Sequence, residues 1–322
     1  MIDLLDGNRK NLSEPFYTKN LAEHGQIVFI QFSPYEWSQD VFLIGFKKKI
    51  LLAHLEITDV LSVRIITEFT HPVRCTALSI SPDTSLAALP NKVIFCVGGN
   101  DFKLRVFNSD LGENSTCKVL SGHTSYINDC MYDPENTFLA STSDDNTVKI
   151  WSTDDYELKS TFSLTSPGMN VCWHRADSGK LLVAEKIGII RFYNVETETS
   201  ILSIDYNKPL SCAHWAPSER DVVASLQLGE LLLWDLTKPC LPLQNNILFP
   251  ENGGRIAFSP QAELVAAVNS LDSTLKVFHV RSQAVKLTAG LTLPTNVCWH
   301  YRYPLICVGD DFKLCFWKVT AN

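Results

Sequence analysis

The chain has 322 residues, of which 45% are hydrophobic, 10% aromatic and 20% charged, which excludes a disordered chain and allows a sizeable core. Lys and Arg total 28 against 35 Asp and Glu, and this formal net charge of −7 excludes the broad basic surface that direct nucleic-acid binding requires. No basic segment followed by an apolar run opens the chain, and no stretch approaches the roughly 20 apolar residues of a membrane span. We therefore expect a soluble, intracellular protein without direct membrane insertion.

The first element in chain order is a short β-prone segment, Phe16-Tyr17-Thr18-Lys19. Residues 1–12 ahead of it are expected to form an N-terminal tail, and residues 13–322 carry a repeating pattern. The ten cysteines are spread along this pattern without a Cys-x-x-Cys pair, so we expect reduced thiols.

Two columns of bulky apolar residues recur along the chain. The first column closes an apolar run ahead of a turn and comprises Phe32, Ile80, Tyr132, Trp173, Trp215, Phe258 and Trp299. The second follows each member of the first at a near-constant distance and comprises Leu51, Phe107, Trp151, Tyr193, Trp234, Phe278 and Trp317. The second repeat is longer than the others because residues 84–91 are inserted between its two columns. Seven repeats result.

Each repeat contains short strand-like runs, such as 28–32 and 231–234, separated by Ser-Pro, Asp-Asp, Gly or Asn turns. A period of about 40 to 45 residues with four strands per unit is typical of WD40 repeats, and seven such units predict a closed β-propeller. The predicted fold is therefore all-β, a seven-bladed WD40 β-propeller.

The third repeat resembles a complete WD40 repeat. In that family a His, a strand Ser or Thr, a turn Asp and a strand Trp form a hydrogen-bonded tetrad, which maps here onto His123, Ser141, Asp145 and Trp151. Ser143 is the alternative hydroxyl, because strand alternation places it on the same face as Ser141. A Ser, a His and an Asp also suggest a hydrolase triad, but an imidazole held inside a blade leaves no room for a substrate carbonyl. We interpret the tetrad as structural.

Three segments depart from the repeat: 84–91, 108–117 and 237–254. The last one places apolar residues between prolines, and such residues either fold back on the ring or meet a partner. It is the predicted partner-binding segment, with four candidate residues: Leu243, Ile247, Leu248 and Phe249.

The seventh repeat stops after Trp317-Lys318-Val319, one strand short of a full blade. Placing 16–19 as the outer strand of this blade closes the ring and removes an exposed edge. We therefore predict that the N-terminal strand closes the last blade.

Other candidate sites give weak signals. Gly98-Gly99 does not continue as a phosphate-binding loop, and Lys47-Lys48-Lys49 is typical of a solvated hairpin tip. His174 and His300 each follow Cys-Trp in separate repeats, so joint zinc ligation is not expected. We predict no catalytic residue, metal, cofactor or small-molecule substrate, and no enzyme activity.

Residues 166–193 carry a more specific resemblance. They contain Ser-Pro-Gly-Met-Asn-Val-Cys-Trp-His and then Val183-Ala184-Glu185-Lys186 and Ile190-Arg191-Phe192-Tyr193, with no Gly-His ahead and Tyr193 in place of the usual Trp. This string resembles the family of the thirty-seven-kilodalton WD-repeat nucleoporin of the nuclear pore. Further agreement lies at Ser109-Asp110-Leu111, Gly122-His123-Thr124, Ala213-His214-Trp215 and Phe316-Trp317.

The resemblance implies a non-catalytic subunit of the Y-shaped outer-ring scaffold complex, located at the nuclear pore complex of the nuclear envelope. It further implies docking onto the large propeller-plus-helical nucleoporin of the short arm, roles in pore assembly and in mRNA and protein transport, and a kinetochore role in mitosis. The alternative is a WD40 peptide-binding adaptor, either a ubiquitin-ligase substrate receptor or a chromatin reader, for which an acidic or aromatic cluster around the central channel is expected.

Overall fold

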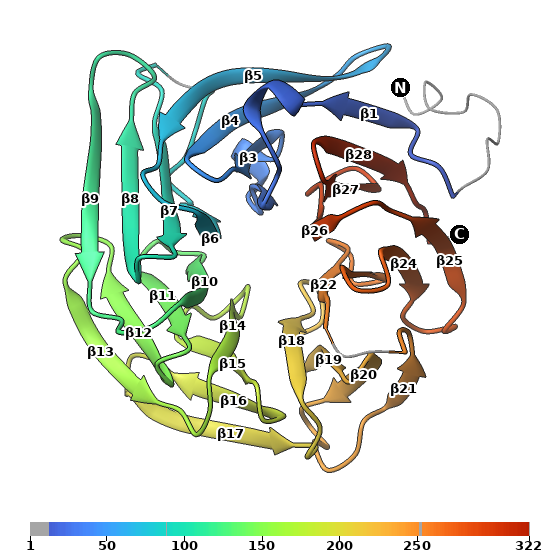
Figure 1. The fold of residues 1–322 in the computed structure, drawn as a ribbon. Helices are drawn as coiled ribbons and strands as arrows, with labels where there is room; N and C mark the ends of the chain where they lie inside the picture. Colours follow the sequence, from blue (N-terminus) through green and yellow to red (C-terminus); the bar gives the residue numbers. More distant parts are fainter. Residues whose placement is uncertain (1–12, 88, 251–252, 322) are drawn as a thin grey trace.

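The computed structural model describes residues 13–87, 89–250 and 253–321, which form a ring of seven four-stranded antiparallel sheets around a central axis (Figure 1). This arrangement confirms the predicted seven-bladed β-propeller. Residues 1–12, the expected tail, lie outside the described residues.

Within each blade the first strand lies next to the ring axis and the fourth forms the rim (Figure 1). Blade 1 comprises β2 (Phe29–Phe32), β3 (Val41–Gly45), β4 (Lys49–Ile57) and β5 (Leu61–Thr70). Blade 2 comprises β6 (Cys75–Ile80), β7 (Val93–Gly99), β8 (Lys103–Ser109) and β9 (Ser115–Ser121). Blade 3 comprises β10 (Ile127–Tyr132), β11 (Phe138–Ser143), β12 (Thr147–Ser152) and β13 (Leu158–Ser163). Blades 4 and 5 comprise β14 (Gly168–Trp173), β15 (Lys180–Glu185), β16 (Ile189–Asn194), β17 (Thr199–Asp205); and β18 (Leu210–Trp215), β19 (Val222–Gln227), β20 (Glu230–Asp235), β21 (Gln244–Ile247). Blades 6 and 7 comprise β22 (Arg255–Phe258), β23 (Leu264–Asn269), β24 (Thr274–His279), β25 (Val285–Gly290); and β26 (Pro294–Trp299), β27 (Leu305–Asp310), β28 (Lys313–Lys318), β1 (Tyr17–Asn20). Two short 3-10 helices cover Ala22–His24 and Glu36–Ser38.

The alternation of strand direction defines two faces of the ring. The connections between blades and the turns between the second and third strands lie on one face, which we call the upper face. The turns between the first and second strands and between the third and fourth strands lie on the opposite, lower face. Residues far apart in the sequence can therefore share one face.

The N-terminal strand closes the ring as predicted. β1 pairs antiparallel with β28, so that Tyr17 lies opposite Phe316 and Thr18 opposite Cys315. The Tyr17 and Phe316 rings lie 5.7 Å apart, and Leu21, directly after the strand, is 1% exposed in the core between blades 7 and 1. The first and last strands of the chain thus share one sheet, so β28 is paired on both sides and is not an exposed edge.

The two sequence columns occupy fixed places in the blades. Each member of the first column is the last residue of an innermost strand, and the second column lies in the third strands. In blade 1 the register pairs Phe32 with Phe42 and Phe42 with Ala53, so Ala53 occupies the second column and the expected Leu51 is two residues out of register. The cause is a longer connection between β2 and β3: Phe32 and its partner Phe42 are ten positions apart, whereas the corresponding partners in blades 3 to 7 are seven or eight positions apart.

Side chains of the inner strands also join neighbouring blades. The Asn170 side-chain amide accepts a hydrogen bond from the Ala213 backbone N–H at 2.8 Å and donates one to the Ala213 carbonyl at 2.7 Å, which links blade 4 to blade 5. The Trp173 indole donates to a backbone carbonyl of blade 3 at 2.8 Å. Asn296 and Trp299 repeat these contacts toward blades 1 and 6. The recurring Asn-Val-Cys-Trp-His sequence therefore joins a blade to both of its neighbours.

Candidate partner-binding surfaces

The four predicted tetrad residues of blade 3 meet inside the blade. His123 Nδ1 lies 2.8 Å from Asp145 Oδ2, and His123 Nε2 lies 2.8 Å from Ser141 Oγ. The Trp151 indole N–H donates to Ser141 Oγ at 3.0 Å. Ser143 instead accepts the Asp145 backbone N–H, so it stabilises the turn and takes no part in the tetrad.

The electrostatics of this network match a neutral imidazole beside a carboxylate. Burial lowers the pKa of His123. Burial also acts to raise the pKa of Asp145, but hydrogen bonds from Thr147, the Thr124 amide and His123 outweigh this effect and hold that pKa below its usual value. The side chains of His123 and Asp145 are 1% and 6% exposed, and Ser141 is fully buried. A hydroxyl enclosed in this way cannot reach a substrate, so the arrangement supports the blade.

The other blades keep only fragments of the network within the described residues. In blade 5 the Trp234 indole donates to Ser225 Oγ at 2.9 Å. In blade 7 the buried Trp317 indole nitrogen has no acceptor. The ring is therefore held mainly by packing between blades and by the inter-blade bonds of the inner strands.

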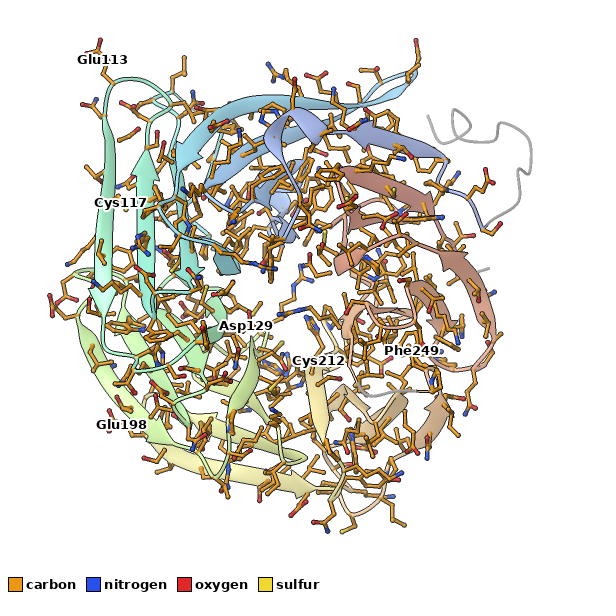
Figure 2. All side chains as sticks on the ribbon, viewed as in Figure 1. Glu113, Cys117, Asp129, Glu198, Cys212 and Phe249 are labelled. Atoms are coloured by element: carbon orange, nitrogen blue, oxygen red, sulfur yellow. The ribbon has the colours of Figure 1, made fainter. Side chains whose placement is uncertain are left out.

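Oppositely charged side chains lie close together at the ring axis. Arg255 of blade 6 extends across to blade 1, where its guanidinium carbon lies 5.2 Å from the Phe29 ring centroid. Asp129 of blade 3 lies next to the axis (Figure 2), and burial raises the pKa of this carboxyl to about 6, an effect that Arg255 opposes. The axis therefore carries a mixture of basic, acidic and aromatic groups.

The lower end of the axis is narrowed by side chains from several blades. Arg175 of blade 4 lies over the ring of Tyr301 from blade 7, with 5.0 Å between the guanidinium carbon and the ring centroid. Tyr35 of blade 1 lies near Arg175 and Asp133, and burial raises the pKa of its phenol. Residues from blades on opposite sides of the ring therefore meet at the lower end of the axis.

The structure corrects the prediction for residues 237–254. Leu248 and Phe249 are 2% and 1% exposed, and they belong to the core between blades 5 and 6. Their backbone N–H groups both donate to the Gly229 carbonyl, at 2.8 and 3.1 Å, which folds the chain back onto the ring. The prediction that these two side chains are available to a partner is therefore wrong.

The rest of this segment forms the rim of blade 5. It contains β21, the outer strand, so it is not the single long loop that the prolines suggested. Leu243, directly before β21, and Ile247, its last residue, are 60% and 78% exposed. They remain candidate partner-binding residues.

A larger set of exposed apolar side chains lies on the upper face over blades 4 to 7. Four occupy the turn between the second and third strands of successive blades and one precedes β26: Ile187, Leu228, Leu271, Phe312 and Leu293. We call these five residues the apolar arc, and they are 40% to 66% exposed. In contrast, the equivalent turns of blades 1 and 3 carry Lys47-Lys48 and Asp144-Asp145-Asn146. In blade 2 this turn carries Phe102, whose ring packs edge-on against the 51% exposed Tyr126 at 5.1 Å, so the upper-face turns are apolar in blades 4 to 7, mixed in blade 2 and polar in blades 1 and 3.

The backbone at Leu228 shows that this apolar residue is locally unfavourable. Leu228 and Gly229 have φ values of 47° and 75°, a two-residue turn for which Asn-Gly is the preferred sequence. A left-handed conformation costs a residue with a branched side chain roughly 1–2 kcal/mol. Local folding therefore does not explain the choice of leucine. Sequence reasoning missed the arc, although an apolar residue where a turn favours Asn or Gly is a readable signal.

Neither a metal-binding cluster nor a membrane-spanning helix is found in the described residues. Within residues 13–87, 89–250 and 253–321, no three His, Cys, Asp or Glu side chains are grouped so that they could hold a metal ion. His300 pairs with Asp40 at 3.0 Å and His174 packs edge-on against Trp215, so the two histidines lie in separate environments. No helix in the described part of the chain is long and apolar enough to cross a membrane.

Comparison with known proteins places the chain in a family. The model of the WD domain, G-beta repeat matches residues 114–152, which include the tetrad. Nucleoporin Nup37 of Drosophila melanogaster is 39% identical over 76% of this chain and 77% of its own length. Nucleoporin Nup37 of Mus musculus is 32% identical over 94% of this chain and 96% of its own length, and that of Homo sapiens 35% identical over 77% and 78%. This chain belongs to the Nup37 nucleoporin family.

Membership of the Nup37 family confirms the resemblance carried by residues 166–193. The apolar arc and the rim of blade 5 both present large apolar side chains to solvent, which makes them the candidate partner-binding surfaces.

Proposed function

We propose that this chain is a non-catalytic scaffold subunit of the nuclear pore complex. Membership of the Nup37 nucleoporin family supports this role. The buried tetrad supports it as well, because His123 uses both ring nitrogens to hold Asp145 and Ser141 and has none left for proton transfer.

The observation that carries the proposal is the apolar arc. Stable subunit contacts bury more than about 1,000 Å² and depend on a few apolar anchors. Five exposed apolar side chains spread over four blades provide such anchors on one face. The chain docks onto another nucleoporin through this face.

In finer detail, the partner is the large propeller-plus-helical nucleoporin of the Y-shaped outer ring. An apolar face accommodates the apolar side of packed helices, which is why a helical partner suits the arc. Through this contact the subunit supports pore assembly and transport of mRNA and protein at the nuclear envelope, and it accompanies the complex to kinetochores in mitosis.

The test compares two double variants by affinity purification and quantitative mass spectrometry. Leu228→Asp with Leu271→Asp places charges on the arc, and Asp tolerates the left-handed backbone at position 228. We expect recovery of outer-ring nucleoporins to fall about tenfold or more. The second variant, Leu243→Asp with Ile247→Asp, places charges on the other candidate surface, where the side chains are 60% and 78% exposed, and docking through the arc predicts that it preserves recovery.

Two outcomes contradict this assignment. If only the rim variant loses its partners, docking takes place at the rim of blade 5. If the wild-type chain recovers no nucleoporin at all, the scaffold role itself is refuted. Circular dichroism and melting temperature of both variants establish that the ring is folded.

A further inference from the structure

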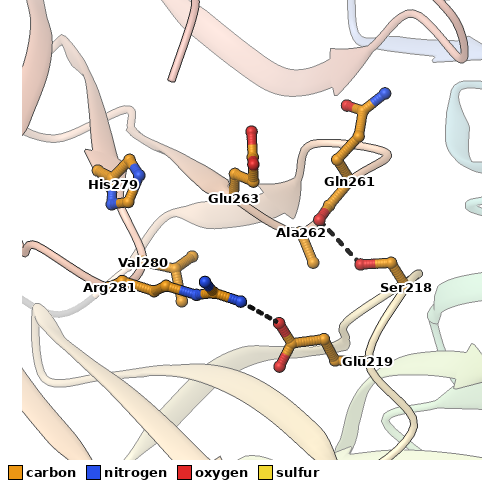
Figure 3. A pocket seen from close by; sticks show the side chains of 8 residues that line it. All are labelled: Ser218, Glu219, Gln261, Ala262, Glu263, His279, Val280 and Arg281. Atoms are coloured by element: carbon orange, nitrogen blue, oxygen red, sulfur yellow. Dashed lines mark hydrogen bonds and ion pairs between the residues drawn. The ribbon is translucent and has the colours of Figure 1, made fainter. Parts of the chain in front are cut away.

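A cleft of about 360 Å³ opens on the lower face between blades 5 and 6 (Figure 3). Ser218 and Glu219, from the turn after β18, form one wall, and Glu263 belongs to the turn after β22. His279, the last residue of β24, and Arg281, in the turn after it, form the opposite wall. Ser218 Oγ donates to the Gln261 carbonyl at 2.8 Å, which fixes the two turns relative to each other.

The polar groups of this cleft are available to a ligand. The Arg281 guanidinium lies 3.7 Å from Glu219, with side chains 85% and 47% exposed, so this ion pair is weak and open to competition. Glu263 is exposed and makes no ion pair within the described residues. His279 Nδ1 accepts the Ser282 backbone N–H, which leaves Nε2 to carry the proton and donate. Two carboxylates against one guanidinium leave an excess of acidic groups.

A smaller cleft of about 130 Å³ continues from the first around the same turn. The two clefts share Gln261 and Glu263. The second is largely apolar, because Trp299, Pro304 and Val319 line it. One aliphatic side chain matches this size and lining.

We propose that the two clefts form one groove that binds an extended peptide segment carrying a basic residue and a nearby aliphatic residue. The basic side chain pairs with Glu263 and Glu219 in the larger cleft, and the aliphatic side chain enters the smaller one. Charge complementarity favours a Lys or Arg side chain in the larger cleft, because acidic groups are in excess there. In the smaller cleft, the apolar lining favours burial of a hydrocarbon side chain. Because the groove and the apolar arc lie on opposite faces, the ring can hold a linear segment while its upper face is docked.

The test uses the purified full chain alone, so its result is independent of whether the arc binds a nucleoporin. A phage library of random twelve-residue peptides is selected on the immobilised chain, and enriched peptides are synthesised with a fluorescein label for anisotropy measurements. We expect enriched sequences with Lys or Arg near Leu, Ile or Val, and binding that weakens as salt concentration rises.

Substitutions then locate the peptide. Glu263→Lys should weaken binding about tenfold or more because it replaces attraction by repulsion. Ala321→Trp, which fills the smaller cleft, should also weaken it, whereas the matched control Glu135→Lys changes an exposed acid in the corresponding turn of blade 3 and should not. If Glu263→Lys lowers the melting temperature of the chain, Glu263→Gln replaces it as the test variant, with a smaller expected loss of peptide binding.

Failure to enrich any basic and aliphatic sequence overturns the proposal. So does a selected peptide that binds the Glu263 and Ala321 variants as tightly as the wild-type chain, because it then binds elsewhere on the ring.

Discussion

Removal of the N-terminal strand should destabilise the whole ring, because β1 completes the sheet of blade 7. The change is deletion of residues 1–22, and deletion of residues 1–12, which leaves β1 in place, is the matched control. The larger deletion removes the backbone bonds of β1 to β28, the contact of Tyr17 with Phe316, and Leu21, which is 1% exposed.

The magnitude follows from these contacts. Losing a buried Leu costs about 2–5 kcal/mol, and each lost backbone hydrogen bond adds about 0.5–1.5 kcal/mol. A total near 5 kcal/mol, at about 2–4 °C per kcal/mol for a domain of this size, predicts a drop in melting temperature of about 10–20 °C.

Differential scanning fluorimetry measures this drop, and a synthetic peptide of residues 13–25 added in excess should reverse part of it. The peptide supplies the missing strand, so recovery depends on its concentration. A melting temperature equal to that of the control deletion would show that β1 contributes nothing to ring closure and would refute the reasoning.

Three further outcomes are expected. Phe249→Ala should lower the free energy of unfolding by about 3–5 kcal/mol in chemical denaturation, whereas Ile247→Ala, at an exposed rim position, should change it by less than about 0.5 kcal/mol; equal effects would contradict the core position of Phe249. Trp151→Phe should cost about 1–3 kcal/mol, because the Ser141 hydroxyl loses its indole donor, and an unchanged stability would argue against a structural tetrad. Thr18→Cys should form a disulfide with Cys315 when an added mild oxidant accepts the two electrons, seen as a mass loss of two hydrogen atoms, because residues directly opposite in an antiparallel pair have Cα atoms about 4.5–5.5 Å apart; absence of this crosslink would contradict the register of β1.

The number of blades and the closure of the ring could be predicted from the sequence because both follow from local patterns. Every first-column residue ends an innermost strand, since a bulky residue ahead of a turn marks the end of a strand in each repeat. The missing last strand of blade 7 and the β-prone segment at 16–19 are equally local observations. The tetrad positions His123, Ser141, Asp145 and Trp151 followed from the resemblance of the third repeat to a complete WD40 repeat, and the structure brings these four side chains together.

Register in blade 1 and burial in blade 5 required the tertiary structure. Leu51 and Ala53 both lie in an apolar run, and only pairing with Phe42 selects Ala53. Leu248 and Phe249 look like exposed loop residues in sequence, because the Gly229 carbonyl that folds them into the core lies about 20 residues earlier in the chain, across the blade.

The architecture follows from local sequence, because strand alternation, turn residues and a regular period act over short distances and are repeated seven times. Which surfaces are available to partners depends instead on how the blades are arranged in space. The apolar arc gathers single residues from four blades, and the lower groove gathers turns from three, so neither forms a contiguous motif along the chain. Closure of the ring brings these residues together, and exposure and proximity on a face are properties that no single repeat possesses.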